Sequence, residues 1–206
     1  MQELREVILK IREAGELVLR QRARELTSAE ILSPEIQELI GSMFETMRAA
    51  PGVGLAAPQI GLPLQIAVIE DRQEYIDQTA REKAAERERS AVAPHVIVNP
   101  RLTAGDEKVE FFEGCLSLPG LTAIVARARA VTVDCLNERA EPVTIQARGW
   151  YARILQHEID HLHGRLYIDR MLSRSFMSRE NFERYWKDLP VAEVRRLIDP
   201  RAEQTD

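Results

Sequence analysis

The sequence has few cysteines, no long apolar run and no excess of basic residues, and each absence excludes a class of protein. Two cysteines among 206 residues are too few for a disulfide framework, so we expect a reducing compartment. No stretch approaches the roughly 20 apolar residues that span a bilayer, and we expect no membrane association. With 28 basic and 33 acidic residues the net charge is −5, which argues against nucleic acid as a partner.

The first ten residues, MQELREVILK, contain no unbroken apolar segment of the kind that secretory signals carry. They are also too acidic for a transit peptide. We therefore expect a cytoplasmic protein of a bacterium or, as the alternative, a protein of an organelle matrix or stroma after removal of a transit peptide. Hydrophobic residues make up 45% and charged residues 30%, which is typical of a chain that folds as a single domain over residues 1–206.

Helical patterns stand at the two ends of the chain and strand patterns in the middle. Ser33 and Pro34 form a typical helix start, and the apolar residues that follow recur with helical spacing as far as Met47. Further helices are predicted over 150–162 and 179–198, and strands over 65–69, 95–100, 108–114, 129–137 and 142–149, the last two as an antiparallel pair. We therefore expect an α+β fold, with antiparallel or mixed β-sheets packed around a central helix, an N-terminal helix and a C-terminal helix.

Three segments are distinguished by their composition or their position along the chain. Residues 51–63 (PGVGLAAPQIGLP) are rich in glycine and proline, which predicts a loop, but its glycines do not have the spacing of a dinucleotide-binding or Walker loop. Residues 72–93 are dominated by charged side chains and are predicted to be a charged surface insertion. Residues 176–206 are predicted to be a C-terminal helical extension.

The strongest motif for chemistry is HEIDH, which begins at His157 and lies within a predicted helix. Residues four apart share one helix face with Cβ atoms about 5–6 Å apart, so His157 and His161 can hold one metal ion. Glu158 can reach a water molecule at that metal instead of the metal itself. An exposed polar helix face is the alternative, but the interleaved apolar residues favour a helix buried on most sides: Ile154, Leu155, Ile159 and Leu162.

A catalytic metal site usually has three protein ligands, and the helix motif supplies only two. His95, His163, any carboxylate and either cysteine remain candidates for the third. Cys115 directly follows a predicted strand and a glycine, where a thiolate can approach a metal. Cys135 alternates within a predicted strand and is typical of a small core residue. The residues favour Cys115 over Cys135 and leave the other candidates open.

Three segments together resemble the peptide deformylase family: GVGLAAPQ (52–59), EGCLS (113–117) and HEIDHLHG (157–164). They match that family's motifs GxGLAAxQ, EGCxS and HExDHLxG in the same order and at similar separations. The resemblance covers about residues 10–175. It implies a single catalytic domain that hydrolyses the N-formyl group from the formylmethionine of newly synthesised proteins and releases formate. Its partners would be N-formyl-methionyl nascent peptides and the ribosome.

The resemblance also implies the metal site. Cys115, His157 and His161 would be the three ligands, which makes the predicted central helix metal-binding, and Glu158 would be the general acid and base. One divalent metal ion is implied, Fe²⁺ in the cell, with Zn²⁺, Ni²⁺ or Co²⁺ able to occupy the same site. Ligation by one sulfur and two nitrogen atoms suits several of these metals.

The resemblance assigns further roles around that metal. The side chain of Gln59 and the backbone N–H of Leu116 would stabilise the oxyanion, and Gly54 would bond an extended substrate backbone. The positions implied to bind substrate are Val53, Gly54, Phe111, Glu113, Gly114, Trp150 and Ile154.

Two other classes of protein would use the same helix motif. A zincin-like metallopeptidase would take a histidine or a glutamate as third ligand, where EGCLS favours a cysteine. A binding module with a structural metal would need a fourth protein ligand, and Cys135 is the only other thiol.

Overall fold

The computed structural model describes residues 7–199 of the chain, with five consecutive strands in its middle and helices on either side. The strands are β1 (Gly54–Ala56), β2 (Ile66–Asp71), β3 (Val92–Ala104), β4 (Lys108–Cys115), β5 (Leu118–Ala128), β6 (Ala130–Leu136), β7 (Pro142–Arg148) and β8 (Met177–Ser178). The α-helices are α1 (Ser28–Ile31), α2 (Pro34–Ala49), α3 (Gln73–Asp77), α4 (Arg81–Glu86), α5 (Gly149–Leu162), α6 (Arg179–Asn181) and α7 (Val191–Ile198).

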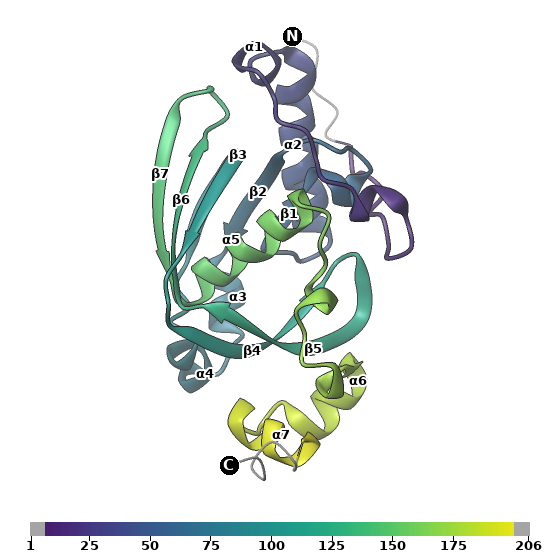
Figure 1. Ribbon diagram of the computed structural model, residues 1–206, viewed down its shortest axis with the longest axis vertical. Helices are drawn as coiled ribbons and strands as arrows, with labels where there is room; N and C mark the ends of the chain where they lie inside the picture. The colour runs from purple at the N-terminus through teal and green to yellow at the C-terminus, as the bar shows by residue number, and fades with distance from the viewer. Residues whose placement is uncertain (1–6, 200–206) are drawn as a thin grey trace.

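The strands form two antiparallel sheets. One has five strands in the order β1-β2-β3-β6-β7, and the other has the order β4-β5-β8. The predicted antiparallel pair over 129–149 is confirmed as β6 and β7. Helix α5 contacts strands of both sheets and lies across the concave face of the larger one (Figure 1). The predicted α+β class is therefore confirmed.

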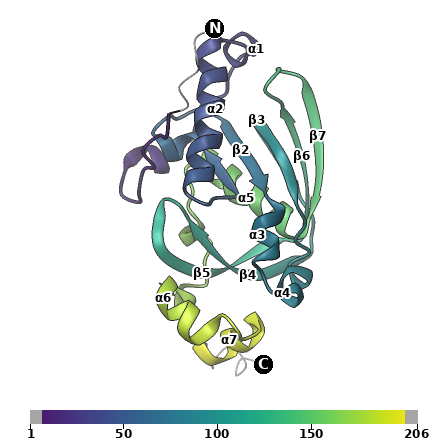
Figure 2. The ribbon, with the colours of Figure 1, turned by 180° about the vertical axis from the view of Figure 1, so that it is seen from behind.

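Strand β2 is buried on both faces and shows how the layers stack. Successive side chains of a strand point to opposite faces. Ile66 and Val68 belong to the apolar cluster that contains α2, and Ala67 and Ile69 belong to the cluster that contains α5. The sheet thus lies between α5 on one face and α2 on the other, which Figure 2 shows from behind.

The predicted helix boundaries agree with the structure to within a residue or two. The hydroxyl of Ser33 accepts a hydrogen bond from the backbone N–H of Ile36 at 3.4 Å and caps α2. Helix α5 ends just before Gly164, whose φ of +72° is typical of a glycine that follows a helix. Pro190 separates α7 from the helical turns before it.

Two segments differ from the sequence-based prediction. The predicted loop over 51–63 contains β1 and a 3-10 turn (Ala57–Ile60). Three residues are too few to show a strand's alternation, so only the pairing of β1 with β2 reveals it. Strand β5 was not predicted because Pro119 and Gly120 near its start are typical of a turn.

The charged segment 72–93 forms α3 and α4. It packs against the body of the protein through buried contacts, which a segment that only faces solvent would lack. Arg89 pairs with the fully buried carboxylate of Asp71 at 2.8 Å. The guanidinium of Arg87 lies 4.7 Å from the ring centre of Trp150, at the start of α5. Charge composition predicts exposure and gives no signal for contacts of this kind.

The C-terminal segment covers the smaller sheet. Val194 of α7 is fully buried in an apolar cluster with Phe112 of β4 and Ile124 of β5. These helices lie beyond the β4–β5 hairpin, at the end of the molecule opposite α1 (Figure 1). Within residues 7–199 no helix is both long enough and apolar enough to cross a bilayer.

Gly149 gives a test of this packing. Its φ is +61°, and a Cβ there would lie 2.5 Å from the Cβ of Glu88 and 2.7 Å from the carbonyl oxygen of Arg87. We expect Gly149→Ala to lower the free energy of unfolding by about 2–4 kcal/mol, measured by urea titration followed by circular dichroism. The matched control is Gly41→Ala in α2, where a Cβ would meet nothing within 4 Å and should stabilise the helix by up to about 1 kcal/mol. Equal stability of the two variants would contradict the packing of segment 72–93 on α5.

Candidate active site

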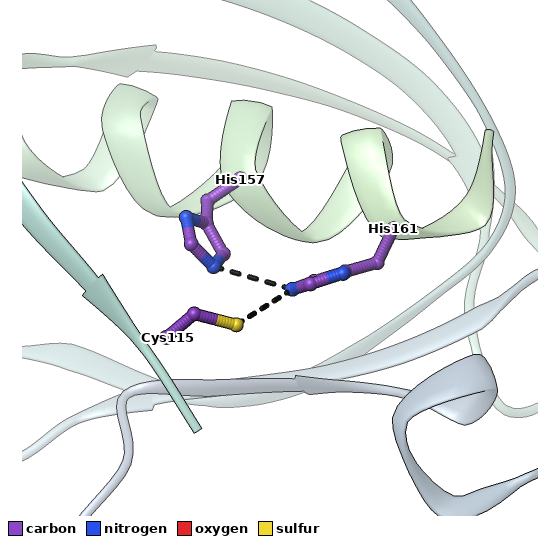
Figure 3. Close-up of side chains that lie close together, drawn as sticks. All are labelled: Cys115, His157 and His161. Carbon is purple, nitrogen blue, oxygen red and sulfur yellow. Dashed lines mark hydrogen bonds between the residues drawn. The ribbon is translucent and has the colours of Figure 1, made fainter. Parts of the chain in front are cut away.

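Three potential metal-ligand atoms converge between the end of β4 and the middle of α5 (Figure 3). Cys115 Sγ lies 3.2 Å from Nε2 of His161, and this nitrogen lies 3.2 Å from Nε2 of His157. All three atoms lie within 4.8 Å of one another. The structure therefore brings the two histidines of the helix motif together with Cys115, the cysteine that the sequence favours.

Local structure explains this convergence. His157 and His161 are four residues apart on α5 and share one face of the helix. Cys115 is the last residue of β4, and the register of β4 against β5 shifts between Glu113 and Cys115. An irregularity of this kind re-aims the side chain that follows it, so the sulfur can leave the sheet and face α5.

The donor atoms fit a divalent metal ion. Bonds of about 2.0–2.3 Å to the corners of a tetrahedron hold neighbouring donors about 3.3–3.6 Å apart, close to the 3.2 Å observed. Nδ1 of His157 donates a hydrogen bond to Oε2 of Glu113 at 3.1 Å, which leaves Nε2 as the atom that would bind a metal. One thiolate and two imidazoles form a donor set that suits several transition metals.

The two imidazoles have opposite pKa shifts. Burial acts to lower the pKa of His157, but hydrogen bonds with Cys115 and Glu113 raise it well above its ordinary value. Burial and the neighbouring His157 lower the pKa of His161 well below its ordinary value. The two Nε2 atoms face each other, so only one of them has room for a proton. A metal ion would require both of these donor atoms to be deprotonated.

Glu158 is a buried carboxylate, and one of its oxygens lacks a hydrogen-bond partner in the described part of the chain. Its side chain is 4% exposed, and its Oε2 has no hydrogen-bond partner among residues 7–199. Burial raises the pKa of Glu158 to about 7. A carboxyl group that titrates near neutrality can both accept and donate a proton. The space for it comes from Gly54, where any Cβ would overlap Oε1 of Glu158.

Gln59 holds an amide N–H toward the three donor atoms. Its Oε1 accepts a hydrogen bond from the backbone of Ala56 at 2.9 Å, which fixes the orientation of the amide. Its Nε2 donates to the hydroxyl of Ser117 at 3.2 Å and lies 3.6 Å from Cys115 Sγ. Leu116 lies in the turn between Cys115 and Ser117, and it lines a cleft that opens beside these residues.

A buried network of charges supports His157. Glu113, 5% exposed, accepts two hydrogen bonds from Arg127 at 2.9 and 3.0 Å and one from Arg153. Burial acts to raise the pKa of Glu113, but the hydrogen bond with His157 and the charge of Arg127 lower it. Arg127 also pairs with Asp160 of α5. The carboxylate therefore stays ionised and fixes the imidazole of His157.

A cleft of about 350 Å³ opens over these groups. Most residues predicted to act on or bind substrate line it: Val53, Gly54, Gln59, Glu113, Gly114, Leu116, Trp150, Ile154, His157 and Glu158. Phe111 does not line it. Its ring packs beside the guanidinium groups of Arg153, at 5.2 Å, and Arg87, at 5.6 Å.

The other candidates for a third ligand lie elsewhere. Cys135 is 7% exposed in the core cluster under the larger sheet, and burial raises its pKa to about 11. His95 forms a hydrogen bond of 2.9 Å with the hydroxyl of Tyr151. His163 is the C-cap residue that follows α5, and it lies outside the group of donor atoms.

Sequence reasoning missed two residues that shape the site. Ser117 orients Gln59, and it is the last letter of the EGCLS motif. The ring of Tyr167 stacks on His157 at 6.4 Å and 20°. Arg153 also lines the cleft and is 3% exposed. The signal for Tyr167 was weak, because nothing local to it distinguishes it from a core residue.

Comparisons with known proteins agree with this geometry. The sequence model of the family described as "Polypeptide deformylase" matches residues 8–176. Peptide deformylase 1 of Bifidobacterium longum is 42% identical over 188 residues, 91% of this chain and 83% of that protein. Peptide deformylase 1A of Arabidopsis thaliana, named chloroplastic/mitochondrial, is 46% identical over 181 residues, 87% of this chain. The chain spans 65% of that plant protein's length and 63% of its tomato counterpart.

A solved structure supports the same assignment. The class I type b peptide deformylase of Acinetobacter baumannii, in a crystal with Met-Ala-Ser bound, matches with a TM-score of 0.72 and 31% identity. The match covers 81% of this chain and 99% of that one. The family model covers most of the chain, and relatives above 40% identity match over nearly all of it. This chain belongs to the peptide deformylase family.

Proposed function

We propose that this protein is a metal-dependent hydrolase that removes the N-formyl group from the N-terminal formylmethionine of newly synthesised proteins and releases formate. One observation carries the proposal: the donor atoms of Cys115, His157 and His161 converge beside the unpartnered carboxylate of Glu158 in an open cleft. A zincin-like peptidase would have a nitrogen or oxygen atom in place of the sulfur. A structural site would need a fourth protein ligand, and Cys135 is not near.

The proposed resident metal is Fe²⁺, held by Cys115, His157 and His161. When bound, such an ion supplies Lewis acidity, which makes a hydroxide nucleophile available near neutral pH. The same donors suit Zn²⁺, Ni²⁺ and Co²⁺. The role of the protein is to orient the donor atoms, and the hydrogen bond from Nδ1 of His157 to Glu113 serves this purpose by turning Nε2 toward the metal site.

Glu158 is the proposed general acid and base. Its raised pKa suits a group that takes a proton from the attacking nucleophile and returns it to the leaving amine. Gln59 and the backbone N–H of Leu116 are the proposed donors to the oxyanion. One N–H of the Gln59 amide is used by Ser117, and the other faces Cys115, where sulfur is only a weak acceptor. Each such donor is worth about 3–4 kcal/mol in the transition state.

The proposed substrate lies extended along β1. This strand is at the edge of the five-stranded sheet, so one side of its backbone is free to pair with a peptide. The methionine side chain would enter the part of the cleft lined by Trp150, Ile154 and His157. The peptide Met-Ala-Ser, bound in the relative from Acinetobacter baumannii, has the composition of a product that has lost its formyl group.

The proposed setting follows from this substrate. Formylated chains are made by ribosomes of bacteria and organelles, so we propose action on chains that leave the ribosome. The compartment would be the bacterial cytoplasm, or an organelle such as the one named for the plant relatives.

The direct test is release of formate from formyl-Met-Ala-Ser by protein purified and metal-analysed without oxygen. We expect formate in stoichiometric amounts and no cleavage of unblocked peptides. Glu158→Gln should keep the metal and lower kcat by about 10²–10⁴-fold, because the amide has the same shape but cannot carry the proton. Cleavage of peptide bonds without formate release would favour the zincin alternative, and loss of metal from Glu158→Gln would make that residue a ligand.

The sulfur ligand is tested by exchanging each cysteine. Cys115→Ser should weaken metal binding and shift selectivity toward harder metals, because oxygen is a harder donor than sulfur. Cys135→Ser is the matched control and should keep one equivalent of metal. Metal content after dialysis, and the thiolate-to-metal absorption of cobalt-substituted protein, measure both effects. A variant at position 115 that retains both signals would remove this cysteine from the ligand set.

We further propose that segment 72–93 braces the wall of the cleft. Arg87 stacks on Trp150 at 4.7 Å and on Phe111 at 5.6 Å, and Glu88 pairs with Arg129 and Arg148 beside them. Trp150 lines the cleft, so the segment would set the position of one of its walls.

Arg87→Ala should therefore raise KM for formyl-Met peptides a few-fold with little change in kcat or metal content, because a cation–π contact is worth about 0.5–2 kcal/mol. The emission of Trp150, measured in a Trp186→Phe background, should shift in parallel. Arg81→Ala in α4 removes an arginine that has no ion pair within residues 7–199, and it should change neither quantity. Unchanged KM and emission in Arg87→Ala would refute the brace.

A further inference from the structure

A second cavity, larger than the cleft, lies against another face of α5. Its volume is about 580 Å³, against about 350 Å³ for the cleft. Gln156, Ile159, Asp160 and His163 line it, with the spacing of a single helix face. That face is distinct from the one that carries His157 and His161. We call this cavity the basic groove, after the lysine and arginine side chains that line it.

The basic groove collects positive charge in a chain whose net charge is −5. Six lysine and arginine residues line it: Arg22, Arg101, Lys108, Arg127, Arg165 and Arg170. Among the described residues that line it, only two are carboxylates, and both are already paired. Glu25 lies 3.5 Å from Arg101, and Asp160 lies 2.7 Å from Arg170 and also pairs with Arg127.

Three of these cations have no carboxylate partner within the part of the chain that the structure describes. Arg22, Lys108 and Arg165 are exposed and form no ion pair with any residue in the range 7–199. They come from segments far apart in the sequence: the loop before α1, the first residue of β4 and the chain just after α5. The fold therefore brings together charges that repel one another, and an anionic ligand would relieve that repulsion.

The shape and chemistry of the basic groove favour phosphate groups on a chain. Guanidinium groups bind phosphate through two parallel hydrogen bonds. The volume is within the range of small-ligand sites and far exceeds that of one phosphate ion. Small residues, Ala104, Gly105, Ala126 and Ala128, also line the groove and leave room for a sugar or a base.

We propose that the basic groove binds a strand of RNA through its phosphates. The whole-chain charge, which argues against nucleic acid, describes the average field and not this local excess. The choice of RNA rests on the proposed function, because chains that leave a ribosome do so beside ribosomal RNA. RNA and the reacting peptide would then be held on two faces of one helix, α5.

The test is fluorescence anisotropy of a fluorescein-labelled 12-nucleotide oligouridylate with the full-length, metal-loaded protein. Contacts from three cations predict a slope of log Kobs against log salt near −2, since each phosphate contact on a single strand contributes about −0.7. The triple variant Arg22→Glu, Lys108→Glu, Arg165→Glu should bind the oligomer at least about tenfold more weakly and lose most of this slope. Its release of formate from formyl-Met-Ala-Ser should equal that of the unchanged protein.

A second triple variant controls for net charge. Arg81→Glu, Arg184→Glu, Arg196→Glu makes the same change in charge at exposed arginines outside the groove, and it should keep most of the affinity. Equal loss of binding in the two triple variants, or no binding at 50 mM salt, would overturn the proposal. Equally tight binding of a poly-glutamate peptide of 12 residues would overturn recognition of phosphate. None of these results bears on deformylation, which is measured separately.

Discussion

The hydrogen bond from His157 to the ionised carboxylate of Glu113 is the contact on which the rest of the site depends. It joins α5 to β4, and these two elements supply all three candidate metal ligands. A buried carboxylate is costly unless it is well satisfied. Here Arg127 and Arg153 satisfy it, and both are themselves 3% exposed. Breaking such a network would leave an uncompensated charge in the interior, so it favours one relative placement of α5 and β4.

Much of the fold follows from patterns local in sequence. The spacing of apolar residues fixes α2 and α5, and single residues such as Ser33 and Gly164 fix their ends. The pairing of β6 with β7 follows from alternation and a short turn. The placement of two histidines on one helix face is also local. Such features need no knowledge of the rest of the chain, because the forces that produce them act over one or two turns.

The features that the sequence did not reveal depend on contacts between distant residues. The residues alone left the third ligand open, and only the resemblance to a family singled out Cys115. Strand β1 is recognisable only through its pairing with β2. The stacking of Arg87 on Trp150 joins residues 63 positions apart in a segment whose charge predicts solvent. The same applies to the basic groove, where six cations from scattered segments converge in a mildly acidic chain.

Gly54 has no side chain, and this affects how many different ligands the cleft can accept. Glycine is required there because a larger residue would occupy the space of Glu158. At position 54, β1 can therefore contact a bound peptide only through its main chain. Contacts of this kind do not depend on the side chains of the peptide. Under the proposed function, discrimination would come from side chains of the cleft such as Trp150 and Ile154, at one end of the ligand. A cleft built in this way would, under the proposed function, screen the first residue closely and tolerate variety in those that follow.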